Sequence, residues 1–108
     1  WGEIYRTRER VSERGHKAGF YVVVSRDCIA GHEDVSTVIC APIYSTHEGL
    51  STQVAVGVAE GLKHDSSIHC DELVSLPKTA LSNFVGALSL GKLGELKRVL
   101  RVAVDAED

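Results

Sequence analysis

The 108 residues are enough for one domain, and 44% hydrophobic with 25% charged residues is typical of a globular chain, which excludes collagen-like, low-complexity and disordered classes. No apolar run is long enough for a membrane span, and no apolar segment follows a basic start as in a signal peptide. The net charge of −3 conceals a basic beginning, because Arg and Lys outnumber the acids only in the first 17 residues. We therefore expect a single domain over residues 1–108, located in the cytoplasm.

The first predicted strand is "GEIYRTR", residues 2–8, in which polar and apolar residues alternate. Arg6, Arg8 and Arg10 recur at every second position, so their side chains lie on one face of an extended segment. Such an arginine stripe suits phosphate groups. The alternative is an edge strand that its charged residues keep soluble.

Two strongly apolar runs follow, "FYVVVS" at residues 20–25 and "VSTVICAPI" at residues 35–43. Each is a continuous apolar run of strand length, which is typical of a buried strand. We expect Pro42 to end the second run.

Three further segments have the length and composition of strands. "TQVAVGV", residues 52–58, alternates cleanly, and "NFVGAL", residues 83–88, is a shorter candidate. "SSIHCDELVSL", residues 66–76, reads as one strand in which Ile68 and His69 point to opposite faces.

One long helix is predicted at the end of the chain. Leu93, Leu96 and Leu100 recur at helical spacing, and Ser89 stands where it can cap the first turn. A shorter helical turn is expected from Pro77. The predicted fold is therefore mostly β (α+β), a small and strongly curved antiparallel sheet or half-barrel packed with a C-terminal helix.

The metal-binding residue types are dispersed along the chain. The three cysteines, Cys28, Cys40 and Cys70, are far apart and form no Cys-x-x-Cys motif. The five histidines are scattered as well, so no ligand cluster with metal spacing is visible. We expect buried, reduced thiols, no metal site and no cofactor.

The order of the segments resembles the MazF/PemK (Kid) family, the ribonuclease toxins of bacterial toxin–antitoxin systems. The resemblance runs almost end to end and rests on "GEIY", "VVVSRD", "STVICAPIYS", "GLKHDSSIHCDELVSLPKTAL" and "VGALS" in this order. It implies an SH3-like barrel of the CcdB/PemK type, a homodimer, metal-independent cleavage of single-stranded RNA, and neutralisation by an antitoxin. The alternative on the same fold is a non-catalytic binding module or a CcdB-like toxin that targets gyrase.

The resemblance also implies where the reaction takes place. The family's Arg-Pro pair before the second strand corresponds to Gly19 and Phe20, so the arginine that acts on the scissile phosphate is absent. Lys17 is the nearest cation that can take its place, and His16 and Arg14 can assist it. The alternative for these residues is an ordinary surface loop.

The family's catalytic hydroxyl corresponds to Tyr44, and the two following residues, Ser45 and Thr46, each offer a hydroxyl instead, unless they only form the turn after the strand. Relatives often have Gln at the position of Glu72, whose carboxylate can accept from the amino group of a base. Tyr44 is suited to base stacking. The expected RNA-binding residues are therefore Arg6, Arg8, Arg14, Tyr44 and Glu72.

Overall fold

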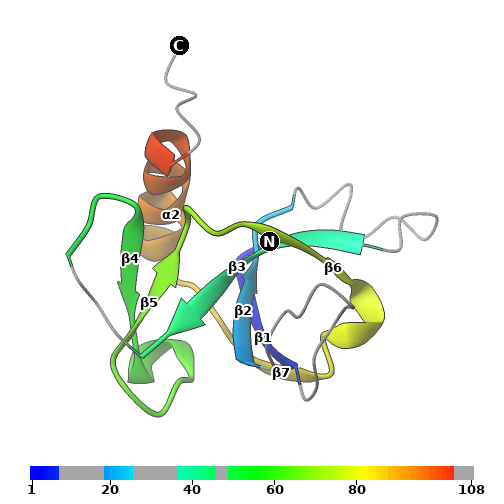
Figure 1. Ribbon diagram of the computed structural model, residues 1–108. Coiled ribbons are helices and arrows are strands. Elements are labelled where there is room, and N and C mark those ends of the chain that lie inside the picture. Colours follow the sequence, from blue (N-terminus) through cyan, green and yellow to red (C-terminus); the bar gives the residue numbers. More distant parts are fainter. Residues whose placement is uncertain (8–18, 26–36, 46–48, 104–108) are drawn as a thin grey trace.

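The computed structural model describes residues 1–7, 19–25, 37–45 and 49–103. In chain order the elements of these parts are β1 (Glu3–Thr7), β2 (Gly19–Val23), β3 (Thr37–Tyr44), β4 (Gln53–Val56), the 3-10 helix η1 (Val58–Glu60), β5 (Ser66–His69), β6 (Val74–Pro77), the 3-10 helix η2 (Lys78–Ala80), β7 (Asn83–Ala87) and α2 (Leu90–Ala103). Helix α2 stands beside β4 and β5, away from β6 and η2 (Figure 1).

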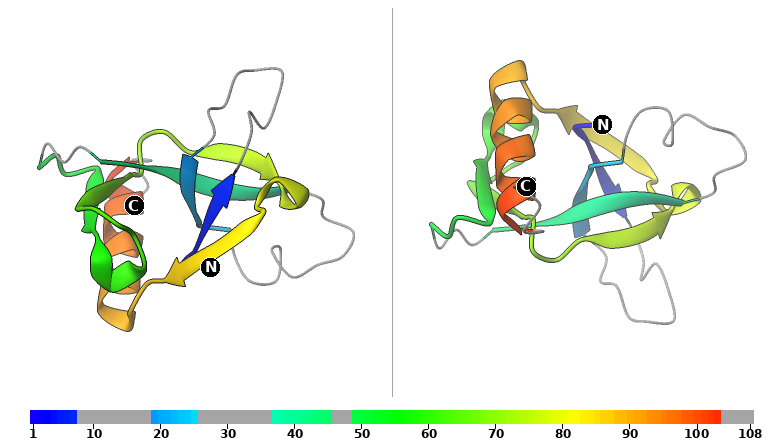
Figure 2. Two further views of the ribbon diagram at one scale, coloured as in Figure 1. Left: turned by 90° about the horizontal axis from the view of Figure 1, so that it is seen from below. Right: turned by 90° about the horizontal axis from the view of Figure 1, so that it is seen from above.

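All paired strands are antiparallel and form one sheet in the order β4-β5-β3-β2-β1-β7, with β6 paired to β3 outside this path. Strand β3 changes partner along its length, because Thr37–Cys40 pair with β6 while Ile43 and Tyr44 pair with β5. The sheet therefore curls into a half-barrel, as the two views in Figure 2 show. This architecture confirms the mostly β prediction.

Two hydrophobic clusters lie on opposite faces of the central strands. In β2, Val22 belongs to the cluster that α2 covers, whereas Tyr21 and Val23 belong to the other cluster. In β3, Ala41 and Cys40 divide between the clusters in the same way. Both faces are buried over residues 21–23 of β2 and 40–43 of β3, which explains why these parts of the sequence are continuous apolar runs instead of alternating ones.

Helix α2 forms where the leucine spacing predicts it. The backbone N–H of Lys92 donates to the Ser89 hydroxyl over 3.3 Å, so Ser89 caps the helix as expected. Leu96 is fully buried, and Leu93 and Leu100 pack against the same cluster. No helix in the described ranges is long and apolar enough to cross a membrane. The short turn predicted from Pro77 is η2.

Two local expectations were wrong, and the edge-strand alternative for the first strand is excluded. Pro42 does not end its strand, because β3 continues to Tyr44 and Pro42 keeps its place opposite Tyr21. The segment 66–76 is two strands, and the turn between them contains a backbone hydrogen bond from Glu72 to His69. Strand β1 is not an edge strand, since it pairs with β2 and with β7.

Candidate functional site

A pocket of about 460 Å³ opens beside the end of β3. Register brings its walls together, because Arg6 lies opposite Phe20 and Phe20 lies opposite Ile43 on three adjacent strands. The segment that follows η1 closes another side. The pocket is lined by Arg6, Phe20, Ile43, Tyr44, Ser45, Leu62, Lys63, His64 and Ser66.

The pocket walls carry cations beside an aromatic ring. The guanidinium carbon of Arg6 lies 6.0 Å from the centre of the Phe20 ring, within the range of a cation–π contact. Arg6, Lys63 and His64 are all exposed, so their polar ends are available to a ligand. The positive charges of Arg6 and Lys63 attract an anion such as a phosphate group.

Tyr44 is held in place by His69, the last residue of β5, and by Glu72 of the β5–β6 turn. Its hydroxyl donates to Oε1 of Glu72 over 3.4 Å, and its ring meets the His69 ring edge-on with the centroids 4.7 Å apart. The Nδ1 atom of His69 lies 3.4 Å from Oε2 of the same Glu72 carboxylate. We call Tyr44, His69 and Glu72 the Tyr44 cluster.

The Tyr44 cluster keeps the tyrosine protonated. Burial, and then the negative charge and the hydrogen bond of Glu72, raise the pKa of Tyr44 above that of a free tyrosine. The phenol is therefore a hydrogen-bond donor at neutral pH.

The structure offers one candidate metal-ligand group among its described residues. Ligand atoms of His69, Asp71 and Glu72 all lie within 4.8 Å of one another. A metal-bound histidine normally donates its second ring N–H to a partner that fixes the ring. In the described part of the chain, Nε2 of His69 is buried and has no hydrogen-bond partner. The group therefore lacks the support that a preorganised metal site requires.

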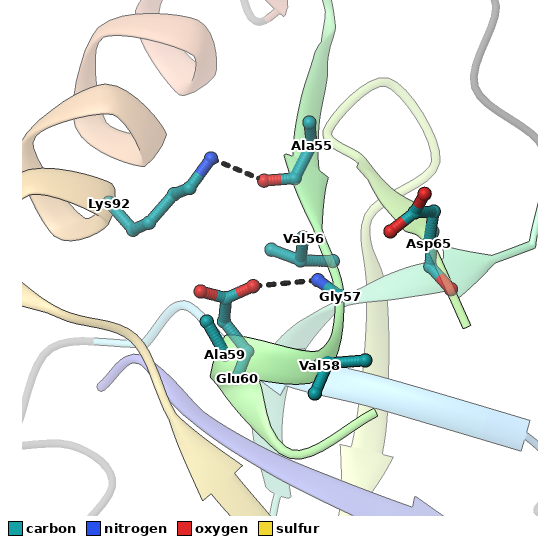
Figure 3. Close-up of a pocket in the computed structure, with 9 residues that line it drawn as sticks. Ala55, Val56, Gly57, Val58, Ala59, Glu60, Asp65 and Lys92 are labelled. Carbon is teal, nitrogen blue, oxygen red and sulfur yellow. Dashed lines mark hydrogen bonds between the residues drawn. The ribbon is translucent and has the colours of Figure 1, made fainter. Parts of the chain in front are cut away.

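A second pocket, of about 640 Å³, lies between η1 and α2. Two of the charged side chains that line it, Lys92 and Glu60, already bind backbone groups of the protein. Figure 3 shows Lys92 donating to the carbonyl of Ala55 over 2.5 Å and Glu60 accepting from the backbone N–H of Gly57 over 2.6 Å. Lys92 also lies 3.6 Å from the carboxylate of Glu95. These contacts hold the helix against β4, so the pocket beside β3 is the better candidate.

The structure brings part of the expected site together. Arg6, Tyr44 and Ser45 all line the pocket beside β3, and Glu72 contacts Tyr44 from the adjacent turn. The remaining expected residues lie outside the described part of the chain: Arg8, Arg14, His16, Lys17, Thr46 and also Cys28. Cys40 and Cys70 are buried free thiols, as predicted.

Sequence reasoning missed three residues near the pocket. Lys63 and His64 line it, and the signal for them was a Lys-His pair one residue before the strand predicted from Ser66. His69 was expected on the face opposite to the buried Ile68, but both are buried, because every residue of β5 is enclosed by the curled sheet.

The position of the family's arginine is defined as well. Gly19 begins β2, and its N–H donates to the buried Thr7 hydroxyl over 3.0 Å. A Cβ atom added at Gly19 would meet nothing within 4 Å. A side chain is therefore sterically permitted at Gly19, directly before the pocket residue Phe20.

Comparison with known proteins agrees with this fold. The family model described as the PemK-like, MazF-like toxin of type II toxin-antitoxin systems matches residues 2–104. The chain belongs to this family. Among relatives of this MazF-like chain, Endoribonuclease MazF3 of Mycobacterium tuberculosis is 29% identical over 91 residues, which are 84% of this chain and 86% of the relative.

Solved structures of MazF-like toxins have the same fold. The Mycobacterium tuberculosis toxin MazF-mt6 superimposes with a TM-score of 0.84 at 25% identity, over 98% of this chain and 99% of that one. A mycobacterial endoribonuclease in complex with its cognate antitoxin gives a TM-score of 0.83 at 20% identity, over 99% of this chain and 95% of the other.

Proposed function

We propose that this MazF-like chain is an endoribonuclease toxin that cleaves single-stranded RNA, messenger RNA in particular, at a short sequence and without a metal ion. The observation that carries the proposal is the pocket beside β3, which is lined by Arg6, Lys63 and His64 together with Tyr44 and Ser45. Family membership and the likeness to an endoribonuclease of M. tuberculosis support it.

The proposed reaction is attack of a ribose 2′-oxygen on the neighbouring phosphorus. The O2′–P bond forms and the P–O5′ bond breaks, while a base accepts the 2′-hydroxyl proton and an acid protonates the leaving 5′-oxygen. His64 is suited to carry a proton, and the Ser45 hydroxyl, which also lines the pocket, is suited to donate one. Arg6 and Lys63 stabilise the added negative charge of the phosphorane. His16, Lys17 and Thr46 remain candidates for the same roles.

The proposed partners follow from the family. We infer a homodimer, neutralised by a cognate antitoxin, which inhibits growth whenever the antitoxin is absent. A solved mycobacterial relative in complex with its antitoxin supports this partner. The proposed location is the cytoplasm, where messenger RNA is the available substrate.

Incubation of the purified protein with a long single-stranded RNA in EDTA tests the reaction. We expect cleavage at defined sites, with a 2′,3′-cyclic phosphate at the new end, because the pocket supplies its own cations. Cleavage that is lost in EDTA and restored by magnesium would contradict the metal-independent mechanism.

A second candidate function is favoured by the residues at the family's Arg-Pro position. Gly19 and Phe20 offer no cation there, as expected for a binding module that has lost cleavage or for a CcdB-like toxin that targets gyrase. RNA that is bound but left intact would favour the binding module. Inhibition of gyrase by protein that leaves RNA intact would favour the gyrase toxin.

A further inference from the structure

Charge is divided on the two sides of Tyr44. Arg6, Lys63 and His64 lie on the pocket side, whereas the carboxylate of Glu72 binds the Tyr44 hydroxyl and that of Asp71 is also near enough to raise the pKa of Tyr44. A phosphate group is attracted to the first side and repelled by the second. We therefore expect RNA in this pocket to place its phosphate backbone next to the basic side chains and one of its bases next to Glu72.

Tyr44 offers this base a surface on which to stack. Its side chain is 42% exposed, and the edge-on contact with the buried His69 fixes the ring plane. An aromatic ring that is partly exposed and held from behind is a stacking platform for a nucleobase.

The Glu72 carboxylate is oriented by the same two neighbours. An ionised carboxylate only accepts hydrogen bonds, with about two acceptor sites on each oxygen. Oε1 uses one site for the Tyr44 hydroxyl, and Oε2 faces Nδ1 of His69. One acceptor site is left on each oxygen, and the Glu72 side chain is 50% exposed.

The unpaired Nε2 of His69 gives independent support. A buried polar atom without a partner costs free energy, so its presence requires an explanation. The ring at this position fixes both Tyr44 and Glu72, and that arrangement is what a binding site for a base requires.

We propose that Glu72 selects guanine in the RNA substrate, an inference that rests on the proposed endoribonuclease function. Guanine presents two adjacent donors, N1–H and the N2 amino group, which match the two free acceptor sites of Glu72. Adenine and cytosine present one amino group beside an acceptor, and uracil presents a donor between two acceptors. Glu72 therefore disfavours uracil most strongly.

Inosine tests this selection, because it lacks only the N2 amino group of guanosine. After cleavage sites are mapped on a long RNA, each guanosine of a short substrate is replaced singly by inosine and single-turnover rates are measured. One such replacement should slow the wild-type protein by about fivefold or more. The Glu72→Gln variant should lose this discrimination, while Glu95→Gln, the same change on α2, should keep it.

The outcomes separate this inference from the proposed function. Cleavage at sites without guanine, or equal rates for guanosine and inosine at every position, would overturn the selection and leave the ribonuclease intact. If RNA is not cleaved at all, the proposed function fails. Fluorescence anisotropy with an adenosine-rich strand that carries one guanosine or one inosine then decides the inference, since equal affinity in the wild type would refute it.

Discussion

Arg6 is positioned by its neighbours to bind the RNA backbone. Its strand lies inside the sheet, and its guanidinium rests over Phe20 instead of turning along an edge. A side chain that is held in this way loses less conformational freedom when it binds a phosphate. The arginine stripe that the sequence indicates therefore has at least one member at the pocket.

Replacing Arg6 with alanine should weaken RNA binding at low salt. Each phosphate contact that is removed lowers the slope of log affinity against log salt by about 0.7 for a single strand. Titrations over a range of salt concentrations measure this slope. Arg98→Ala, an exposed arginine of α2, is the matched control and should leave it unchanged. An unchanged slope in the Arg6 variant would assign this residue to solubility.

Gly19→Arg should increase cleavage. A side chain at this position has free space, and the N–H that binds Thr7 belongs to the backbone and is retained. The new guanidinium would stand at the position of the family's arginine, one residue before the pocket residue Phe20, and one electrostatic contact in the transition state is worth on the order of 10²–10³ in rate.

Gly19→Ala is the control for the arginine, since it adds the Cβ atom without the charge. It should fold like the wild type and leave single-turnover cleavage unchanged. Equal rates for Gly19→Arg and the wild type would mean that another cation, for which Lys17 is the candidate, already serves the phosphate. Lys17→Ala would then be expected to lose most of the cleavage.

Among the elements, α2 closes the half-barrel through a single fully buried side chain. Leu96→Ala should lower the free energy of unfolding by about 2–5 kcal/mol, because it removes buried methyl groups and leaves a cavity. Val102, on the same helix, is 53% exposed, and Val102→Ala should cost no more than about 0.5 kcal/mol. Urea unfolding of the two variants gives the comparison. Similar losses would show that α2 does not cover the core as described.

Strand β3 links the elements to the site. Because β3 pairs first with β6 and then with β5, the turn that joins these two strands lies beside β3, and the Tyr44 hydroxyl contacts Glu72 of that turn. A strand that ended at Pro42, as its sequence predicts, would leave this contact unmade.

At the scale of the whole molecule, the buried thiols connect stability to pH. Burial raises the pKa of Cys40 and of Cys70 to about 12, and the nearby Asp71 adds to the effect at Cys70. Unfolded thiols titrate near pH 8.5, so above this pH the unfolded state loses protons that the folded state keeps. The stabilisation is fully present below about pH 8.5 and is lost as the pH rises toward 12.

The free energy of unfolding should therefore fall above about pH 9, by roughly 1.4 kcal/mol per pH unit for each buried thiol. Urea unfolding between pH 8 and 10.5 measures this dependence. A variant with Cys40→Ala and Cys70→Ala should be less stable but should show a shallower fall. The same fall in the variant would assign the pH dependence to other groups.

The sequence by itself determined the elements and the family. Leu93, Leu96 and Leu100 predicted the helix because a stripe of apolar residues at helical spacing must be buried, and that requirement is local. The apolar runs predicted the central strands for a similar reason. The order of the segments identified the family, and the resemblance assigned Gly19 to the position of the family's arginine and Tyr44 to that of its catalytic hydroxyl.

The tertiary structure decided which residues meet at the site. The sequence predicts only that His69 lies on the face opposite to Ile68, whereas the curl of the sheet buries every residue of β5 and brings the His69 ring against Tyr44. Lys63 and His64 reach the same pocket from another segment. Alternation along one strand tells which residues share a face, but only the pairing of distant strands decides whether a face meets water or protein.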